Sequence, residues 1–356
     1  MVAALAEALR RRLTRPWTVM EVCGGQTHAI VRSGLDQLLP DHLRLIHGPG
    51  CPVCVTPTAI LDRAMALAGR PEVMLCSYGD MLRVPGSQPG SDLLAVRAAG
   101  GDVRLLTTPL QALALARRHP DRQVVLLAVG FETTAPATAL LARQALAVGV
   151  TNLSLLVAHV RVVPAMAALL EDPACSVQGF LAAGHVCAVT GTAELEALVR
   201  LHRRPVVVTG FTPPEILRGL LACVQQLEQG QAAVVNAYGQ VVRADGNPQA
   251  RALLEAVFEP VDLAWRGLGL IAGGGLMLRP AYAALDASRR LDGAGSSSSS
   301  DGGSPTAPCI SDLVLQGRAH PCQCPAFAKT CTPHHPLGVP MVSDEGACAA
   351  WFRYRR

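Results

Sequence analysis

The chain has 356 residues, of which half are hydrophobic and 16% are charged. A chain of this length can bury a full core in two or three domains without disulfide support. The net charge is only +4 and the one basic run is 353–356, which gives little support to nucleic-acid binding. Neither a membrane-spanning run nor a signal-peptide pattern is present. We therefore expect a cytoplasmic protein, in which 12 cysteines indicate metal or redox chemistry.

Short β-rich runs alternate with Ala- and Leu-rich segments along the first 210 residues. This alternation predicts α/β units with parallel sheets. The expected strands lie at residues 17–22, 44–47, 73–77, 103–107, 124–129, 153–158, 179–183 and 206–209. Helices are expected at 110–119 and 134–148, and again at 216–229 and 248–258.

The same patterns predict how the chain divides. The expected parts are an N-terminal helix (1–15), two α/β domains (16–120 and 121–210) and a C-terminal, mainly helical and loop-rich domain (211–356). A Gly-Phe turn follows a Val-rich strand at 130–131 and again at 210–211, which hints that the two α/β domains are related. A Ser- and Gly-rich insert at 292–308 is expected to be flexible.

Conspicuous side chains follow the predicted strands. Ligands of open α/β sheets bind at the carboxyl ends of strands, where loop backbone and helix N-termini converge. Cys23 follows the first strand and precedes two glycines, and Cys51 and Cys54 follow the second in a loop rich in glycine and proline. Two thiols at this spacing can cycle between dithiol and disulfide or hold a soft metal. The further candidates in strand-end loops are His28, His47, Glu132 and His185.

Several of these residues also have a purely structural interpretation. Cys23 fits a small buried residue at a strand end, and Glu132 fits a cap of the helix that follows it. The cysteines expected to belong to the core are Cys76, Cys175, Cys187 and Cys223.

A second group of cysteines lies near the C-terminus, at Cys309, Cys324, Cys331 and Cys348. Four thiolates without alternating histidines suit a four-sulfur zinc site or an iron–sulfur cluster. Zinc sites favour pairs of cysteines with two to four residues between them, whereas only one residue lies between Cys322 and Cys324. The spacing therefore favours a [4Fe–4S] cluster over zinc, with a disulfide third because of the expected compartment. Cys322 is expected to be a spare exposed thiol.

Taken in order, these motifs resemble the HypD family of [NiFe]-hydrogenase maturation proteins along nearly the whole chain apart from the insert. The matching blocks are 20–28, 47–57, 130–136, 184–191, 210–217 and 309–354. The resemblance implies that the C-terminal quartet holds a [4Fe–4S] cluster. It also implies that Cys23 ligates an iron atom and that Cys51 and Cys54 form a redox-active pair.

The resemblance further implies a scaffold on which iron receives two cyanides and one carbon monoxide, giving an Fe(CN)2CO unit. A small partner, HypC, shares the iron, and HypE supplies the cyanide. Thiolate suits low-spin iron, and the backbone N–H groups after Cys23 are expected to lower the pKa of its thiol. Electrons are expected to pass from the cluster through Cys51 and Cys54.

The chain departs from the family pattern at four positions. Gln26 stands where histidine is usual, Thr212 where glutamate is usual, and Ser311 and Pro340 where cysteines are usual. A different class of function also fits the residues: an iron–sulfur-dependent dithiol/disulfide oxidoreductase that uses Cys51 and Cys54. A structural zinc protein is a third alternative, and the sequence leaves open whether the protein is an enzyme.

Overall fold

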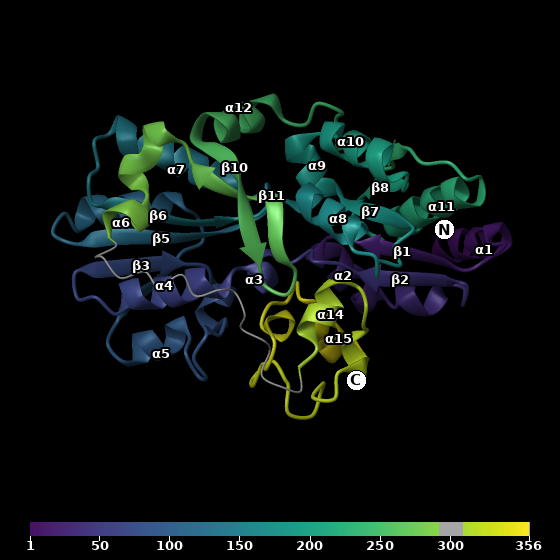
Figure 1. Cartoon of the computed structure of the whole chain (residues 1–356), viewed down its shortest axis with the longest axis horizontal. Coiled ribbons are helices and arrows are strands. Elements are labelled where there is room, and N and C mark those ends of the chain that lie inside the picture. Colours follow the sequence, from purple (N-terminus) through teal and green to yellow (C-terminus); the bar gives the residue numbers. More distant parts are fainter. Residues whose placement is uncertain (292–308, 356) are drawn as a thin grey trace. The chain divides into compact units, whose positions relative to one another are not determined.

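The computed structural model describes residues 1–291 and 309–355 (Figure 1). The predicted insert at 292–308 lies outside the described residues. The chain forms two compact α/β units. Unit 1 consists of residues 1–54, 162–248 and 309–355. Unit 2 consists of residues 55–161 and 249–291.

In the described part of the chain, unit 1 is built on a five-stranded sheet, sheet A, with the order β2-β1-β7-β8-β9. Every neighbouring pair is parallel. The strands are β1 (Trp17–Glu21), β2 (Leu43–His47), β7 (Gly179–Ala183), β8 (Val206–Thr209) and β9 (Val234–Asn236). β7 and β8 are buried at every position, as expected of central strands in a parallel sheet.

The helices of unit 1 pack apolar side chains against this sheet, with Val19, Leu181 and Leu220 in one buried cluster. They are α1 (Val2–Arg12), α2 (Gly24–Ser33), η1 (Leu35–Leu38), α3 (Pro52–Val55), α8 (Val162–Glu171), α9 (Gly184–Thr190), α10 (Ala193–His202) and α11 (Pro213–Glu228). The C-terminal segment adds α14 (Ser311–Leu315), η4 (Pro321–Gln323), η5 (Val339–Met341) and α15 (Ala347–Tyr354). This segment is helical and loop-rich, as predicted, and α15 packs on α2.

The described residues of unit 2 form a four-stranded parallel sheet, sheet B, with the order β4-β3-β5-β6, and an antiparallel hairpin of β10 and β11. The strands are β3 (Val73–Ser77), β4 (Asp102–Leu105), β5 (Gln123–Gly130), β6 (Leu153–His159), β10 (Phe258–Trp265) and β11 (Gly269–Leu278). The helices are α4 (Thr58–Ala68), η2 (Gly79–Arg83), α5 (Leu93–Ala98), α6 (Leu110–Arg118), α7 (Ala135–Ala147), α12 (Pro248–Val257), η3 (Pro280–Leu285) and α13 (Ala287–Arg290).

Every strand predicted from the sequence is present, and the predicted helices coincide with α6, α7, α11 and α12 to within three residues. The sequence analysis missed β9, β10 and β11. The glycine-rich run at 267–275 turns out to hold the hairpin turn and much of β11. Gly275 lies in β11, where a Cβ would come 2.8 Å from Leu263 on β10. Glycine is therefore needed here because the two strands approach closely, and it does not mark a loop.

The first four strands of each sheet, taken in chain order, have the same spatial order, and the predicted relation between two α/β domains stays a prediction. In sheet A, β1 has β2 on one side and β7, then β8, on the other; in sheet B, β3 has β4 on one side and β5, then β6, on the other. The repeated Gly-Phe turn does not mark this relation. Gly130 ends the third strand of sheet B, whereas Gly210 follows the fourth strand of sheet A.

The units divide the chain differently from the predicted boundaries at 120 and 210. β5 and β6 pair with β3, so they belong with residues expected in the first domain. β7 and β8 pair with β1, so they return to the unit in which the chain starts. Parallel strands are paired through long crossovers, and strand sequences alone do not reveal which crossover closes which sheet.

Within residues 1–291 and 309–355, no helix combines the length and the apolar character that crossing a lipid bilayer requires.

Candidate functional site

The strand order of sheet A changes direction at β1. From β1 the chain passes to β2 on one side and later returns to β7 on the other. In open α/β sheets such a switch point opens a crevice at the carboxyl ends of the two strands, where ligands bind. Cys23 follows β1 and His185 follows β7, and the Cys23 Sγ lies 3.7 Å from Nε2 and 3.9 Å from Nδ1 of His185. The structure thus brings two predicted site residues together.

Cys23 is the N-cap residue of α2, and its side chain is 2% exposed. Burial raises the pKa of the Cys23 thiol well above its usual range, and this effect outweighs the backbone N–H groups of Gln26 and Gly25, which lower it. The Glu21 carboxylate raises the pKa further. The expectation of a lowered pKa is therefore wrong for the protein without iron, because the loss of solvent exceeds the gain from two hydrogen bonds. In this structure Cys23 is a neutral thiol.

His185 is held by an aromatic ring from the loop after β8. Its imidazole stacks on Phe211, with ring centroids 5.0 Å apart and an angle of 3° between the planes. A Cβ at Gly25 would come 3.3 Å from the Phe211 ring, so this glycine makes room for the stack. Burial lowers the pKa of His185, which favours the neutral imidazole near pH 7.

The loop that carries Cys51 and Cys54 lies directly against the backbone of Cys23. The Gly24 N–H donates to the Gly50 carbonyl at 2.8 Å. A Cβ at Gly50 would lie 2.3 Å from the Cys23 nitrogen, so only glycine fits there. The predicted pair forms a buried disulfide with Cα atoms 5.3 Å apart. The first two strand ends of sheet A therefore present one thiol and one disulfide side by side.

The C-terminal cysteines also gather in unit 1. Cys324, Cys331 and Cys348 pack in one apolar cluster with Met341. A Cβ at Gly338 would lie 2.6 Å from the Cys309 Sγ, and the Leu337 N–H donates to the Cys331 Sγ at 3.3 Å. Burial raises the pKa of Cys348 well above its usual range, and the nearby thiols of Cys309, Cys331, Cys324 and Cys322 raise it further.

This donor set fits a bound metal centre. In the described residues, no three His, Cys, Asp or Glu side chains are arranged as ligands of a single ion. Cys331 is buried and the other three thiols are half-buried. Burial, and then the neighbouring cysteines, raise the pKa values of Cys309 and Cys348, so these two thiols ionise readily only beside a cation that neutralises them. A four-cysteine set of this kind suits zinc or a [4Fe–4S] cluster. Cys322 is exposed, as predicted for a spare thiol.

The quartet adjoins the disulfide. The Cys54 Sγ lies 4.0 Å from the carbonyl oxygen of Val339, which begins η5 and follows the glycine that packs on Cys309. A Cβ at Gly24 would lie 2.6 Å from the Glu345 Cβ, so the C-terminal segment also presses on the loop of Cys23. Three chain segments thus meet at the carboxyl edge of sheet A.

The structure places His28 and Glu132 elsewhere. The His28 Nε2 lies 3.1 Å from the Tyr354 hydroxyl, and the two rings meet edge to face, so His28 contacts α15. Glu132 is buried at the carboxyl end of β5 in unit 2. The role predicted for each of these two residues stays a prediction.

Two departures from the family pattern have structural explanations. The Gln26 amide donates to the carbonyls of Ala182, Thr209 and Gly210, which fastens α2 to the ends of β7 and β8. Thr212 caps α11 in a reciprocal capping box with Glu215. Of the cysteines predicted to lie in the core, Cys76, Cys187 and Cys223 are buried, and Cys175 is half-buried.

The sequence analysis missed two residues that border Cys23, namely Glu21 and Phe211. The Cys23 N–H donates to the Glu21 Oε2 at 2.9 Å. A carboxylate in an otherwise apolar strand end was the available signal for Glu21, whereas no signal identified Phe211 beyond its position in a strand-end loop.

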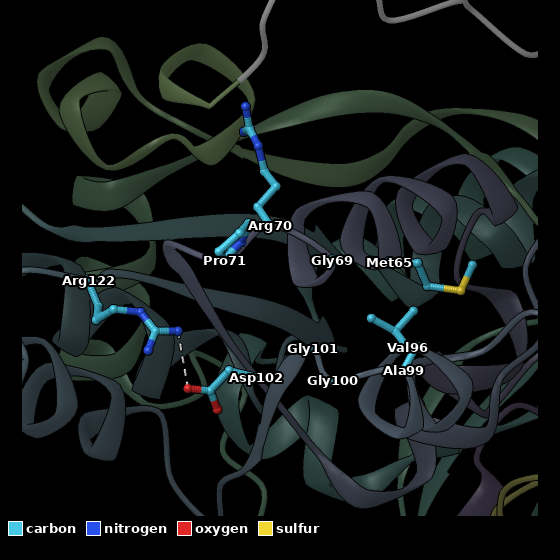
Figure 2. Close-up of a pocket in the computed structure, with 10 residues that line it drawn as sticks. All are labelled: Met65, Gly69, Arg70, Pro71, Val96, Ala99, Gly100, Gly101, Asp102 and Arg122. Atoms are coloured by element: carbon cyan, nitrogen blue, oxygen red, sulfur yellow. Dashed lines mark hydrogen bonds and ion pairs between the residues drawn. The ribbon is translucent and has the colours of Figure 1, made fainter.

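A larger hollow lies in unit 2 at the opposite, amino edge of its sheet. Its volume is about 790 Å3, and it is lined by residues of α4 and α5, by the turns before β3 and β5 and by the start of β4 (Figure 2). Figure 2 shows Arg122 pointing at Asp102, with which it forms an ion pair at 3.3 Å. Arg70 donates to the Leu291 carbonyl at 2.6 Å. Because its cations bind protein groups and it lies at the edge away from strand-end loops, we do not assign the function to this hollow.

Comparison with known proteins identifies the family of the chain. The HypD family model, described as "Hydrogenase formation hypA family", matches residues 1–355. The hydrogenase maturation factor HypD of Escherichia coli (strain K12) is 43% identical over 100% of this chain and 95% of its own length. The factor of the same name from Rhodobacter capsulatus is 43% identical over 99% of this chain and 93% of its own length. That of Azotobacter vinelandii is 45% identical over 96% of this chain and 90% of its own length. The chain therefore belongs to the HypD family.

Proposed function

We propose that this protein is a hydrogenase maturation factor that serves as a scaffold, on which an iron atom receives two cyanides and one carbon monoxide. The observation that carries the proposal is the meeting of Cys23 and His185 at the switch point of sheet A, with the Cys51–Cys54 loop against the Cys23 backbone. The membership of the HypD family and the hydrogenase maturation factors among its relatives support it.

In this proposal the iron is the cargo and Cys23 is its protein ligand. The thiol gives up its proton when the iron–sulfur bond forms, and the neutral imidazole of His185, 3.7 Å away, accepts that proton. Thiolate is a suitable ligand for the soft iron centre that cyanide and carbon monoxide create. Burial keeps Cys23 protonated until iron arrives, which protects it from reaction with other electrophiles.

Cys51 and Cys54 supply redox chemistry beside that ligand. Their oxidation from dithiol to disulfide releases two electrons and two protons. We assign the adjacent quartet, Cys309, Cys324, Cys331 and Cys348, as the ligands of a [4Fe–4S] cluster, which when bound supplies one-electron chemistry. The contact of Cys54 with Val339, which lies between Cys331 and Cys348 in the chain, supports the proposal that the disulfide and the quartet act together. A HypC-type protein that shares the iron and a HypE-type cyanide donor are the proposed partners.

Infrared spectroscopy of the anaerobically purified complex with a HypC-type partner tests the proposal. The expected result is a set of cyanide and carbon monoxide bands that Cys23→Ala abolishes. Cys175→Ala is the matched control, because Cys175 is half-buried and belongs to neither group of site thiols. Full bands in the Cys23→Ala protein contradict the assignment of the iron ligand.

The buried Cys51–Cys54 disulfide also favours a second candidate, an iron–sulfur-dependent dithiol/disulfide oxidoreductase. In that case Cys23→Ala retains disulfide reduction, and no infrared bands of bound diatomic ligands appear in the wild type. Iron and zinc analysis of the purified protein decides the metal of the quartet independently of both candidates.

A further inference from the structure

A chain of hydrogen bonds runs from α15 to the backbone of Cys23. The Trp351 indole N–H donates to the His47 Nε2 at 3.0 Å. The His47 Nδ1 lies 2.7 Å from the Glu21 Oε1, and the Glu21 Oε2 accepts the Cys23 N–H at 2.9 Å. Three bonds therefore connect the helix that carries Cys348 with the amide of the proposed iron ligand.

The chemistry of the groups fixes the direction of each bond. An indole nitrogen only donates, so the His47 Nε2 carries a lone pair and its Nδ1 carries the proton. His47 therefore donates to Glu21. The Thr27 hydroxyl donates to the same carboxylate, so both oxygens of Glu21 accept hydrogen bonds from the protein. A carboxylate meets this requirement, and the amide of a glutamine does not, because its N–H2 group only donates.

The hydrogen-bonded side chains of Glu21 and His47 lie in the protein interior, where apolar side chains are usual. Glu21 is fully buried and His47 is 7% exposed. Replacing such buried polar groups by well-packed apolar side chains often leaves the stability of a protein unchanged or increases it. The presence of Glu21 and His47 therefore indicates that they position neighbouring groups rather than stabilise the fold. Glu21 and His47 are register partners at the last positions of β1 and β2, from which the loops of Cys23 and Cys51 start.

We propose that Glu21, His47 and Trp351 are positioning residues, which fix the Cys23 loop relative to the Cys51–Cys54 loop. Because Trp351 belongs to the C-terminal segment, the relative position of the two loops depends on that segment. Trp351 follows Cys348 by one turn of α15. Its ring also meets His320 edge to face at 4.1 Å, just before η4 and Cys324. A metal centre held by the quartet would restrain α15 at Cys348 and, through Trp351, the Cys23 loop. The inference rests on the proposed function, because it takes Cys23 and the quartet as parts of one site.

Hydrogen exchange of the Cys23 amide, resolved by mass spectrometry with electron-transfer fragmentation, tests the first part. In Trp351→Phe, which keeps an aromatic ring and loses the N–H, this amide is expected to exchange about tenfold faster than in the wild type. Trp17→Phe is the matched control, because the Trp17 indole donates to Glu228 at 2.7 Å at the opposite end of β1 from Glu21. Equal rates in wild type and Trp351→Phe overturn the proposal.

The dependence on the quartet has a separate measurement. The wild-type Cys23 amide is expected to exchange more slowly in the metal-containing protein than after removal of the metal by a chelator. In Trp351→Phe that difference is expected to vanish, and in His47→Gln, whose side chain offers one acceptor and one donor, it is expected to be retained in part. A metal-dependent difference that persists unchanged in Trp351→Phe contradicts the link. If the wild-type complex shows no infrared bands of bound cyanide and carbon monoxide, the proposed function fails whatever the exchange rates are.

Discussion

At the residue scale, burial decides the protonation state of the groups that matter. Cys23, Cys51, Cys54 and His185 could be proposed from the sequence, because cysteines and histidines in Gly-flanked strand-end loops are conspicuous. Sequence reasoning gave the wrong direction for the pKa of Cys23, because the desolvation of a side chain depends on neighbours from distant segments. Which residues lie beside a thiol, such as Phe211, follows from packing and not from spacing along the chain.

His159 provides a pH-dependent prediction for unit 2. It is fully buried, its Nδ1 donates to the Gly130 carbonyl at 3.2 Å, and burial lowers its pKa from 6.5 to about 4. Between these values the unfolded chain binds a proton that the folded protein does not, so stability falls as pH drops below 6.5, by about 3 kcal/mol in total at pH 4. Thermal unfolding of wild type and His159→Asn across this range checks it, and a wild-type melting temperature no more pH-dependent than that of the variant contradicts it.

At the element scale, the sequence predicted which segments form helices and strands better than it predicted which strands pair with one another. Apolar runs of four to eight residues bounded by loops identify buried parallel strands, and all such strands were found. The partly exposed β9 and the glycine-rich β11 carry no such pattern. The contact of two strand-end loops at Gly50 was also not predictable, since it depends on β1 and β2 being register partners.

Gly50 gives a steric prediction for this contact. In Gly50→Ala the new Cβ would stand 2.3 Å from the Cys23 nitrogen, so the two loops must separate. We expect the infrared bands of the loaded complex to fall at least about tenfold, because small displacements between reacting groups are costly. Gly239→Ala is the control, since a Cβ there meets nothing within 4 Å. Equal loading of the two variants counts against the contact as part of the site.

At the scale of the whole molecule, one sheet topology occurs twice, and the chain leaves unit 1 after Cys54 and re-enters it at Val162. The carboxyl edge of sheet A is then covered by a segment far away in sequence, residues 309–355. The family resemblance identified the quartet in that segment, whereas its contact with the disulfide required the fold.

Removal of residues 309–355 tests the role of this cover. Cys54 is fully buried and contacts Val339 in the removed segment. The disulfide is therefore expected to be reduced by dithiothreitol about tenfold faster or more in the shortened chain, because exposure governs access of the attacking thiolate. A thiol-release assay measures the rate, and the point variant Val339→Ala, which keeps the backbone carbonyl, serves as the control. An unchanged rate in the shortened chain shows that the segment does not protect the pair.

The interleaving of the two units also sets an order in time. Unit 2 has all of its described strands once residue 278 has been synthesised, whereas Cys23 and the disulfide lack their C-terminal neighbours until Glu345 and Trp351 have left the ribosome. The thiols of the first 54 residues are thus made early and enclosed last. During synthesis they form an open site, and its closure coincides with the arrival of the last cysteine of the quartet, Cys348.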